Sequence, residues 1–293
     1  MKTKLFSLLL ACVVTTATMS AYVIEDVKIG DLHYELETNS KTAKVIKSED
    51  HTQLTSAYIP SYVSYGGQQY HVTTIGEFAF FTCEEIKSIT ISNSVTSIEP
   101  YAFSDCSSLT SINLPQSITC IDDRVFAHCA RLFSISIPRG VQRIGYAAFL
   151  GCALIEVTIP DGVTLIEGEA FAGCMKLKSV SIPNSVTEIG EFAFADSRAL
   201  KSVTIPNRIK SIRRGTFKFF HSMQSVTIPN SVTSIGEGAF EDCNSLVSVT
   251  IPNSVTSIEK WAFIFCSSST FNNTIAFIFC NSSIVARDRK SVV

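Results

Sequence analysis

The sequence predicts a solenoid of stacked strand-and-turn coils, and three observations lead to that prediction. A unit of 23 residues recurs along most of the chain, each copy holds apolar residues in the same slots, and no single copy could bury them alone. A fixed period in the twenties is typical of repeat architectures whose coils share one continuous core. Aligned on one phenylalanine, the copies place it at Phe80, Phe103, Phe126, Phe149, Phe171, Phe194, Phe217, Phe240 and Phe263.

One half of each unit has the pattern of a β-strand. Val249 and Ile251 alternate with Ser248 and Thr250, which is the period-2 pattern of a strand with one buried face. Proline ends this strand in most copies, because it lacks an N–H donor and fixes φ. The prolines concerned are Pro138, Pro160, Pro183, Pro206, Pro229 and Pro252.

The other half of the unit supplies a second apolar pair and a short turn segment. Val232 and Ile235 are expected inside, and the segment GEGAFEDC at 236–243 is long enough for one or two helical turns. An acid often opens this segment, which suits the first turn of a helix. The acids are Glu99, Asp122, Glu167 and Glu259. The predicted fold class is therefore α/β, with parallel strands on one face and short helices or turns on the other.

Seven of the ten cysteines occupy one slot of the repeat, three residues after the phenylalanine. They are Cys83, Cys106, Cys129, Cys152, Cys174, Cys243 and Cys266. Ser197 and Phe220 fill the same slot in the two remaining coils, so the slot favours a small buried apolar group over a chain of disulfides. No C-x-x-C or Cys/His cluster indicates a metal site.

The N-terminal residues 1–21 are predicted to be a secretory signal peptide. Lysines at positions 2 and 4 precede an apolar run from Leu5 to Val14, and small residues follow up to Ala21. Leu9–Cys12 also resembles a bacterial lipobox, so lipidation of Cys12 is the alternative. Neither end of the chain carries a stretch long enough for a comfortable transmembrane span.

The domain order expected after the signal is a cap, a solenoid and a tail. Residues 22–71 predict an N-terminal cap with two β-hairpins, at 31–48 and 62–72, and a partial first repeat around Leu54–Ile59. Such a cap shields the first open edge of a solenoid. About nine coils occupy 72–266. The template fails in 267–293, which is expected to be an irregular tail.

Three surface features are candidates for binding. Serine and threonine alternate along the outward side of the strands, which indicates either a partner or glycan surface or a solvated sheet face. The slot two residues before the phenylalanine varies, and its aromatics predict either partner contacts or packing between coils. A basic patch, whose partner would be an acidic protein or a sulfated glycan, comprises Arg198, Lys201, Arg208, Lys210, Arg213, Arg214 and Lys218.

The sequence contains none of the residue patterns that usually indicate catalysis or nucleic-acid binding. Charge is nearly balanced, with 24 basic and 26 acidic residues, which gives no argument for nucleic acid. The five histidines are scattered, and no nucleophile elbow, phosphate-binding loop or paired carboxylates occur. The sequence therefore predicts a protein that is not an enzyme and needs no cofactor.

The units IPNSVTSIGEGAFEDCNSLVSVTIP and IPNSVTSIEKWAFIFC resemble the 23-residue leucine-rich repeats of the BspA-type surface proteins. The resemblance covers residues 54–266. It implies a leucine-rich-repeat solenoid in an open arc or horseshoe, and it implies a secreted or surface adhesin that binds extracellular host proteins or other cells. Because the matched residues are structural, the alternative is a structural or self-associating spacer without a specific ligand.

Overall fold

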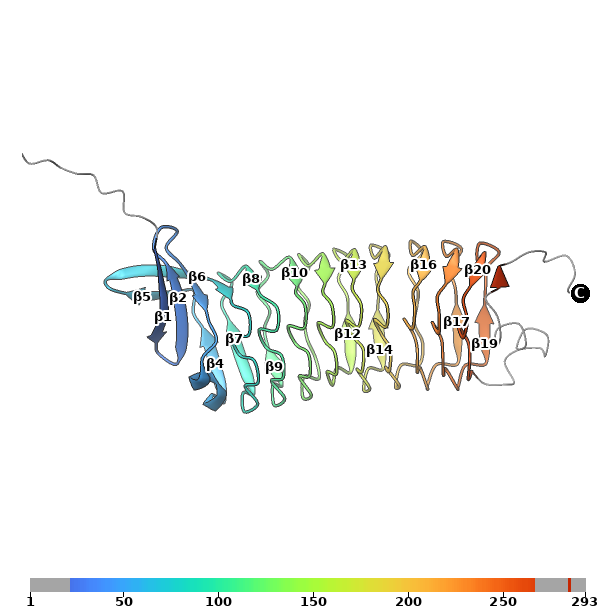
Figure 1. Cartoon of the computed structure of the whole chain (residues 1–293), viewed down its shortest axis with the longest axis horizontal. Coiled ribbons are helices and arrows are strands. Elements are labelled where there is room, and N and C mark those ends of the chain that lie inside the picture. Colours follow the sequence, from blue (N-terminus) through green and yellow to red (C-terminus); the bar gives the residue numbers. More distant parts are fainter. Residues whose placement is uncertain (1–21, 267–283, 286–293) are drawn as a thin grey trace, which may run out of the picture.

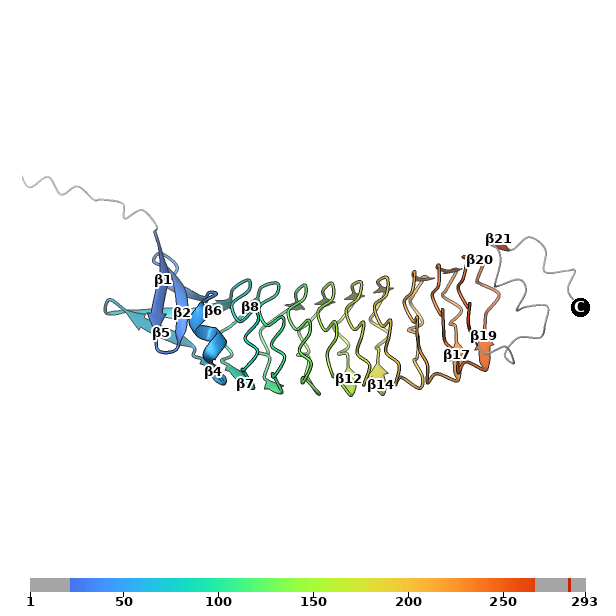
Figure 2. The same ribbon diagram turned by 60° about the horizontal axis from the view of Figure 1, so that its bottom comes forward.

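The computed structural model describes residues 22–266 and 284–285, which form a β-sheet cap followed by a stack of coils (Figure 1). The coils follow one another in a nearly straight row in both views (Figure 2), which agrees with the open arc of the two expected shapes and not with the horseshoe. The predicted signal peptide at 1–21, Cys12, and the tail at 267–293 apart from Ile284–Val285 lie outside the described residues.

Two rows of short parallel strands run along the stack (Figure 1). Neighbouring strands are in register one repeat apart, as in the pairs Ile144↔Ile166 and Ser225↔Ser248. One row contains β8 (Ser97–Ile98), β10 (Cys120–Ile121), β11 (Arg143–Ile144), β13 (Leu165–Ile166), β15 (Glu188–Ile189), β16 (Ser211–Ile212), β18 (Ser234–Ile235) and β20 (Ser257–Ile258), with β21 (Ile284–Val285) antiparallel to β20. The other contains β7 (Ser88–Ile91), β9 (Ser111–Ile112), β12 (Glu156–Thr158), β14 (Ser179–Ser181), β17 (Ser225–Thr227) and β19 (Ser248–Thr250).

The repeating phenylalanines form one ladder through the core, as the period predicts. The nine repeat phenylalanines from Phe80 to Phe263 are each at most 3% exposed. Each ring stacks on the next, with 5.1–6.1 Å between ring centroids. Full burial of such a side chain contributes about 1.5–3 kcal/mol. The core is therefore a line of equivalent layers in which every layer covers its neighbours.

The turn segments form turns and not short helices, so the helical alternative of the α/β expectation is wrong. The one helix of the described residues is the 3-10 helix η1 (Glu49–Gln53) in the cap. In each coil the residues two before and two after the phenylalanine have φ between 51° and 68°. A residue in that left-handed region cannot continue a right-handed helix, so two of them per coil break it.

Hydrogen bonds between coils replace the helical ones. The N–H groups of Phe78, Phe80 and Thr82 donate to carbonyls of the next coil, and Phe80 reaches Ala102 O at 2.8 Å. The intervening N–H groups donate to carbonyls three residues back in their own coil. Since turn and strand sides are both held coil to coil by backbone bonds, both keep a similar spacing. This accounts for the nearly straight stack.

The acids at the start of the turn segments bind the neighbouring coil rather than cap a helix. The Glu99 carboxylate accepts from the Glu77 N–H at 2.8 Å, and Glu259 accepts from the Glu237 N–H at 3.1 Å. These two acids accept hydrogen bonds from backbone N–H groups that have no helical carbonyl as a partner. The rule of acids at helix starts therefore identified capping residues but assigned them to the wrong element.

Side chains in the variable slot two before the phenylalanine pack along the stack. Phe78 stacks on Tyr101 at 4.9 Å, and the Arg124 guanidinium lies 5.7 and 5.3 Å from the rings of Tyr101 and Tyr146. Of the two alternatives, packing between coils accounts for these aromatics. Trp261, at the last described coil, is 44% exposed.

The repeated cysteines form a second ladder of free thiols beside the phenylalanines. The eight cysteines within the described residues are all free. From Cys106 onward each repeat-slot thiol donates to the carbonyl of the preceding coil's phenylalanine, with Sγ···O distances of 3.0–3.3 Å. Ser197 makes the same bond to Phe171 O at 3.5 Å, which explains why serine can replace cysteine in this slot.

These thiols are expected to resist alkylation in the native state. Burial raises the pKa of Cys83 and of Cys174 to about 12. At pH 8 the thiolate fraction is then about a thousandfold below that of an unperturbed thiol. In a chain with Cys12 and Cys280 changed to serine, iodoacetamide should label the half-buried Cys120 and Cys266 first, and the buried thiols of the ladder only after urea is added. Rapid native labelling of Cys174 would contradict the buried ladder.

The cap is a curled sheet in the order β1-β2-β3-β6-β5 that runs into the solenoid where β6 pairs with β8. Its strands are β1 (Val23–Ile29), β2 (Leu32–Glu37), β3 (Thr42–Val45), β5 (Tyr62–Tyr65) and β6 (Gln68–Ile75), while β4 (Ser56–Ile59) pairs with β7. The β2–β3 and β5–β6 hairpins lie where the alternation predicts them. Sequence reasoning missed β1 and η1.

Candidate functional site

A polar hollow lies on the strand face of the middle coils. It is a groove of about 870 Å³. The outward residues of β12 and β14 line it, together with residues 134–137 of the coil before them, which hold the same repeat slots but form no strand. These lining residues include Ser134, Ser136, Glu156, Thr158 and Ser181. The hydroxyl surface predicted from the sequence is thus hollowed rather than flat at this point.

The turns beside this groove contain two charged residues, each followed by a glycine. Most other coils place Asn-Ser or Gln-Ser after the strand-ending proline, whereas these two coils have Arg139-Gly140 and Asp161-Gly162. A Cβ on Gly162 would lie 2.8 Å from the Arg139 carbonyl oxygen, a distance that real Cβ atoms do not tolerate. Close approach of the two turns therefore requires glycine at 162, and it leaves Arg139 and Asp161 at the rim.

The charges of the groove are not used internally. Arg139, Glu156 and Asp161 form no ion pair with any other described residue. Arg143, on the other row of strands, contrasts with them because it contacts Asp122, Asp123 and Glu167. A charge without an internal partner can pair with a ligand without first breaking a native contact. The groove therefore offers one cation and two carboxylates among hydroxyl groups.

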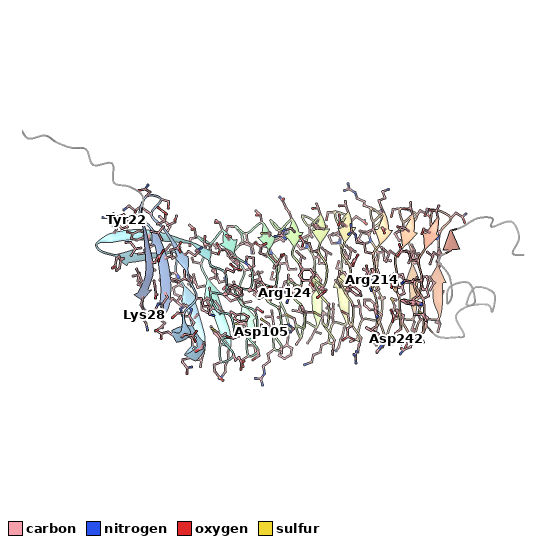
Figure 3. All side chains as sticks on the ribbon, in the orientation of Figure 1. Tyr22, Lys28, Asp105, Arg124, Arg214 and Asp242 are labelled. Atoms are coloured by element: carbon pink, nitrogen blue, oxygen red, sulfur yellow. The ribbon has the colours of Figure 1, made fainter. Side chains whose placement is uncertain are left out.

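The seven predicted basic residues do not form one patch. Lys201 lies in the irregular segment 200–206, Arg208 and Lys210 lie between that segment and β16, and Arg213 and Arg214 open the turn segment. Arg198 and Lys218 line a separate hollow of about 470 Å³ on the turn side, with Asp242 at its rim. Figure 3 shows Arg214 near mid-height of the stack and Asp242 below it.

Four of the seven are neutralised by acids. Arg198 contacts Asp196 at 2.7 Å and Arg213 contacts Glu188 at 2.8 Å. Arg214 lies 3.9 Å from Glu237, and Lys218 lies 2.8 Å from Glu241. Exposed pairs of this kind contribute little to stability, but they reduce the local positive potential. Lys201, Arg208 and Lys210 remain as exposed cations without an ion pair among the described residues.

The sequence carried a signal for this neutralisation. Arg214 and Glu237 are one repeat of 23 residues apart, as are Lys218 and Glu241. In a solenoid such residues are neighbours on adjacent coils, so a search for acids along the chain near the basic run could not find them. Comparison of the same slot in successive coils would have found both pairs.

The part of the chain that the structure describes holds no cluster of three or more His, Cys, Asp or Glu side chains suited to a metal ion. His33 is the one histidine there that contacts two carboxylates, Asp26 at 2.5 Å and Asp50 at 3.2 Å. That cluster lies in the cap, away from the strand-face groove. The groove's chemistry is that of polar contacts and ion pairs.

Comparison with known proteins places the repeats in a family. A family model described as BspA type leucine rich repeat region, in six copies, matches residues 50–178 and 164–284. A search of curated protein sequences finds no match.

Solved structures share the architecture. A leucine-rich repeat protein from Bacteroides ovatus is 30% identical with a TM-score of 0.67, over 82% of this chain and 70% of that one. The leucine rich repeat protein TpLRR of T. pallidum is 23% identical with a TM-score of 0.54, over 83% of this chain and all of that one. The second likeness shows the fold alone.

Proposed function

Because the chain belongs to the BspA-type leucine-rich repeat family, we propose that it is a non-enzymatic secreted or surface protein that binds another protein through its strand face. The observation that carries this proposal is the groove with Arg139, Glu156 and Asp161 unpaired on its surface. A partner with charges of both signs would fit it. Extracellular proteins, or proteins of other cells, are the partner class that the family suggests.

Export is part of the same proposal. It rests on the predicted signal peptide at 1–21, with lipid anchoring at Cys12 as the alternative. Within 22–266 and 284–285 no helix is long and apolar enough to span a bilayer.

The proposal is tested by measuring binding to immobilised extracellular-matrix proteins and sulfated glycans. The groove variant restores the residues of other coils, as Arg139→Asn with Glu156→Ser and Asp161→Asn. A matched variant removes the unpaired cations, as Lys201→Gln with Arg208→Ser and Lys210→Thr. We expect saturable protein binding that weakens at least about tenfold, or about 1.4 kcal/mol, in the groove variant.

The other outcomes separate the alternatives. Binding lost only in the cation variant, especially binding to a sulfated glycan that falls with added salt, would move the site to Lys201, Arg208 and Lys210. An absence of saturable binding across the panel would favour the spacer hypothesis. Melting curves of both variants should match the original chain, because none of the six side chains is buried.

A further inference from the structure

The β5–β6 hairpin projects from the N-terminal end of the molecule in both views (Figures 1 and 2). Every residue from Ser64 to Gln69 is exposed. β5 is the last strand of the cap sheet and pairs antiparallel with β6 alone. The hairpin is therefore an arm with a free strand edge.

The register shows which backbone groups of β5 face outward. The Val72 N–H donates to the Ser61 carbonyl at 3.0 Å, so residues 61 and 72 form a hydrogen-bonded pair of the ladder. Such pairs alternate along an antiparallel ribbon, so Val63↔Tyr70 and Tyr65↔Gln68 are the next two. The N–H and C=O groups of Tyr62 and Ser64 consequently point away from β6.

The opposite edge of the same sheet is protected, and β5 is not. β1 has an irregular register between Ile24 and Val27, a positive φ at Asp26, and the charges of Glu25, Asp26 and Lys28. Bulges and charges are the devices that prevent edge pairing. β5 has neither, and no Asp, Glu, Lys or Arg occurs between Asp50 and Glu77.

Exposed tyrosines surround this edge. Tyr58, Tyr62 and Tyr65 are 63%, 52% and 43% exposed. Tyrosine is enriched at protein interfaces because its large ring loses little entropy on binding. A free edge with the exposed rings of Tyr62 and Tyr65 on the arm, and Tyr58 of β4 also exposed, marks a contact surface.

We propose that β5 pairs antiparallel with β5 of a second copy of this chain, about a two-fold axis at Val63. Tyr62 of each copy then lies opposite Ser64 of the other, and their outward N–H and C=O groups form both hydrogen-bonded pairs. Val63 faces its own counterpart on the side where it packs against the core.

A second copy is the occupant that the strand itself fits. Antiparallel pairing of identical strands brings like charges together unless the strand is uncharged, and this one is. A two-fold axis uses the same surface on both partners, and the arm projects away from the solenoid, so the two stacks can extend in different directions. The inference is independent of the groove and of its ligand.

Sedimentation equilibrium of the full chain, from about 1 μM to about 1 mM, tests the pairing. We expect the weight-average mass to rise from one towards two chain masses. Ser64→Pro should keep the chain monomeric, because proline removes an N–H that only the second copy would use and is tolerated on the free side of an edge strand. Ser64→Lys should weaken association at least tenfold.

The matched control is Ser111→Lys, an exposed serine in β9 of the solenoid, which should dimerise like the original chain. Hydrogen–deuterium exchange of the Tyr62 and Ser64 amides should be slowed only at high protein concentration. A chain that stays monomeric throughout would overturn the proposal. So would association that persists unchanged in both the Ser64→Lys and Ser64→Pro variants, or that is lost equally in Ser111→Lys.

Discussion

Replacing Phe171 with alanine is expected to lower the free energy of unfolding by about 3–5 kcal/mol. Phe171 is fully buried in the middle of the ladder, with centroids of Phe149 and Phe194 at 5.2 and 5.3 Å. Alanine would remove the burial of one ring and the stacking of two. The surrounding backbone cannot collapse into the space, because it is held to both neighbouring coils by hydrogen bonds such as Phe171 N–H to Ala193 O at 2.7 Å.

The shape of the transition carries as much information as its midpoint. In a solenoid, stability is a sum of coils and nearest-neighbour interfaces, so a cavity in one rung weakens the coupling between the two halves. Urea unfolding followed by circular dichroism should therefore shift to lower urea and broaden. Phe133→Ala, at a half-exposed position of the strand face, is the control and should cost much less. Equal shifts for the two variants would rule out the ladder as the main source of stability.

The repeat and its buried slots could be predicted from the sequence because nine copies report on the same environment. The phenylalanine ladder, the thiol slot and the strand pattern each recur, so one error in one copy does not mislead. The helical alternative for the turn segment was wrong for the opposite reason. Its backbone depends on bonds to the next coil, such as Phe80 to Ala102, and local helix rules take no account of such bonds.

The candidate site was harder to predict, because binding features are departures from the repeat. Glu156 occupies a strand slot that holds serine in the other coils, and Gly162 allows the close approach of two turns beside the groove, but neither departure by itself indicates a groove. The basic run was visible as a stretch of sequence, whereas Glu188, Glu237 and Glu241 neutralise it from adjacent coils. In a solenoid, residues in the same slot of adjacent coils are close in space, so neighbours must be sought one repeat away as well as nearby in the sequence.

His51 ends the phenylalanine ladder on the cap side, and we expect it to make the cap sensitive to acid. Its ring is fully buried and stacks on Phe80 with centroids 5.0 Å apart. The His33 backbone N–H donates to Nε2 at 3.2 Å, so Nδ1 carries the proton of the neutral ring and donates to Ala79 O at 2.9 Å. A second proton on Nε2 would face an N–H donor.

The pKa shifts of the two neighbouring histidines act in opposite directions. Burial lowers the pKa of His51, so its stabilising contribution is present above about pH 6.5 and is lost as pH falls through the folded-state value. The Asp26 hydrogen bond, opposed by burial and aided by Asp50, raises the pKa of His33. Its contribution is present below about pH 6.5 and is lost as pH rises through its folded-state value.

His51→Ala is expected to lower the free energy of unfolding by at least about 2 kcal/mol at pH 7.5, because the His33 N–H and the Ala79 carbonyl both lose a buried partner. The measurement is the urea midpoint at pH 7.5 and at pH 5.5. The stability of His33→Asn should fall more steeply with acid than that of the original chain. This variant lacks the His33 contribution, which grows as pH falls, and keeps the His51 contribution, which is lost as pH falls. In His51→Ala the loss of stability in acid should be smaller, because the remaining His33 increases the free energy of unfolding as pH falls. If the acid sensitivity is unchanged in His51→Ala, groups elsewhere in the chain cause it. If the acid sensitivity is lost, one buried imidazole joins the cap to the ladder and sets the pH range in which they stay joined.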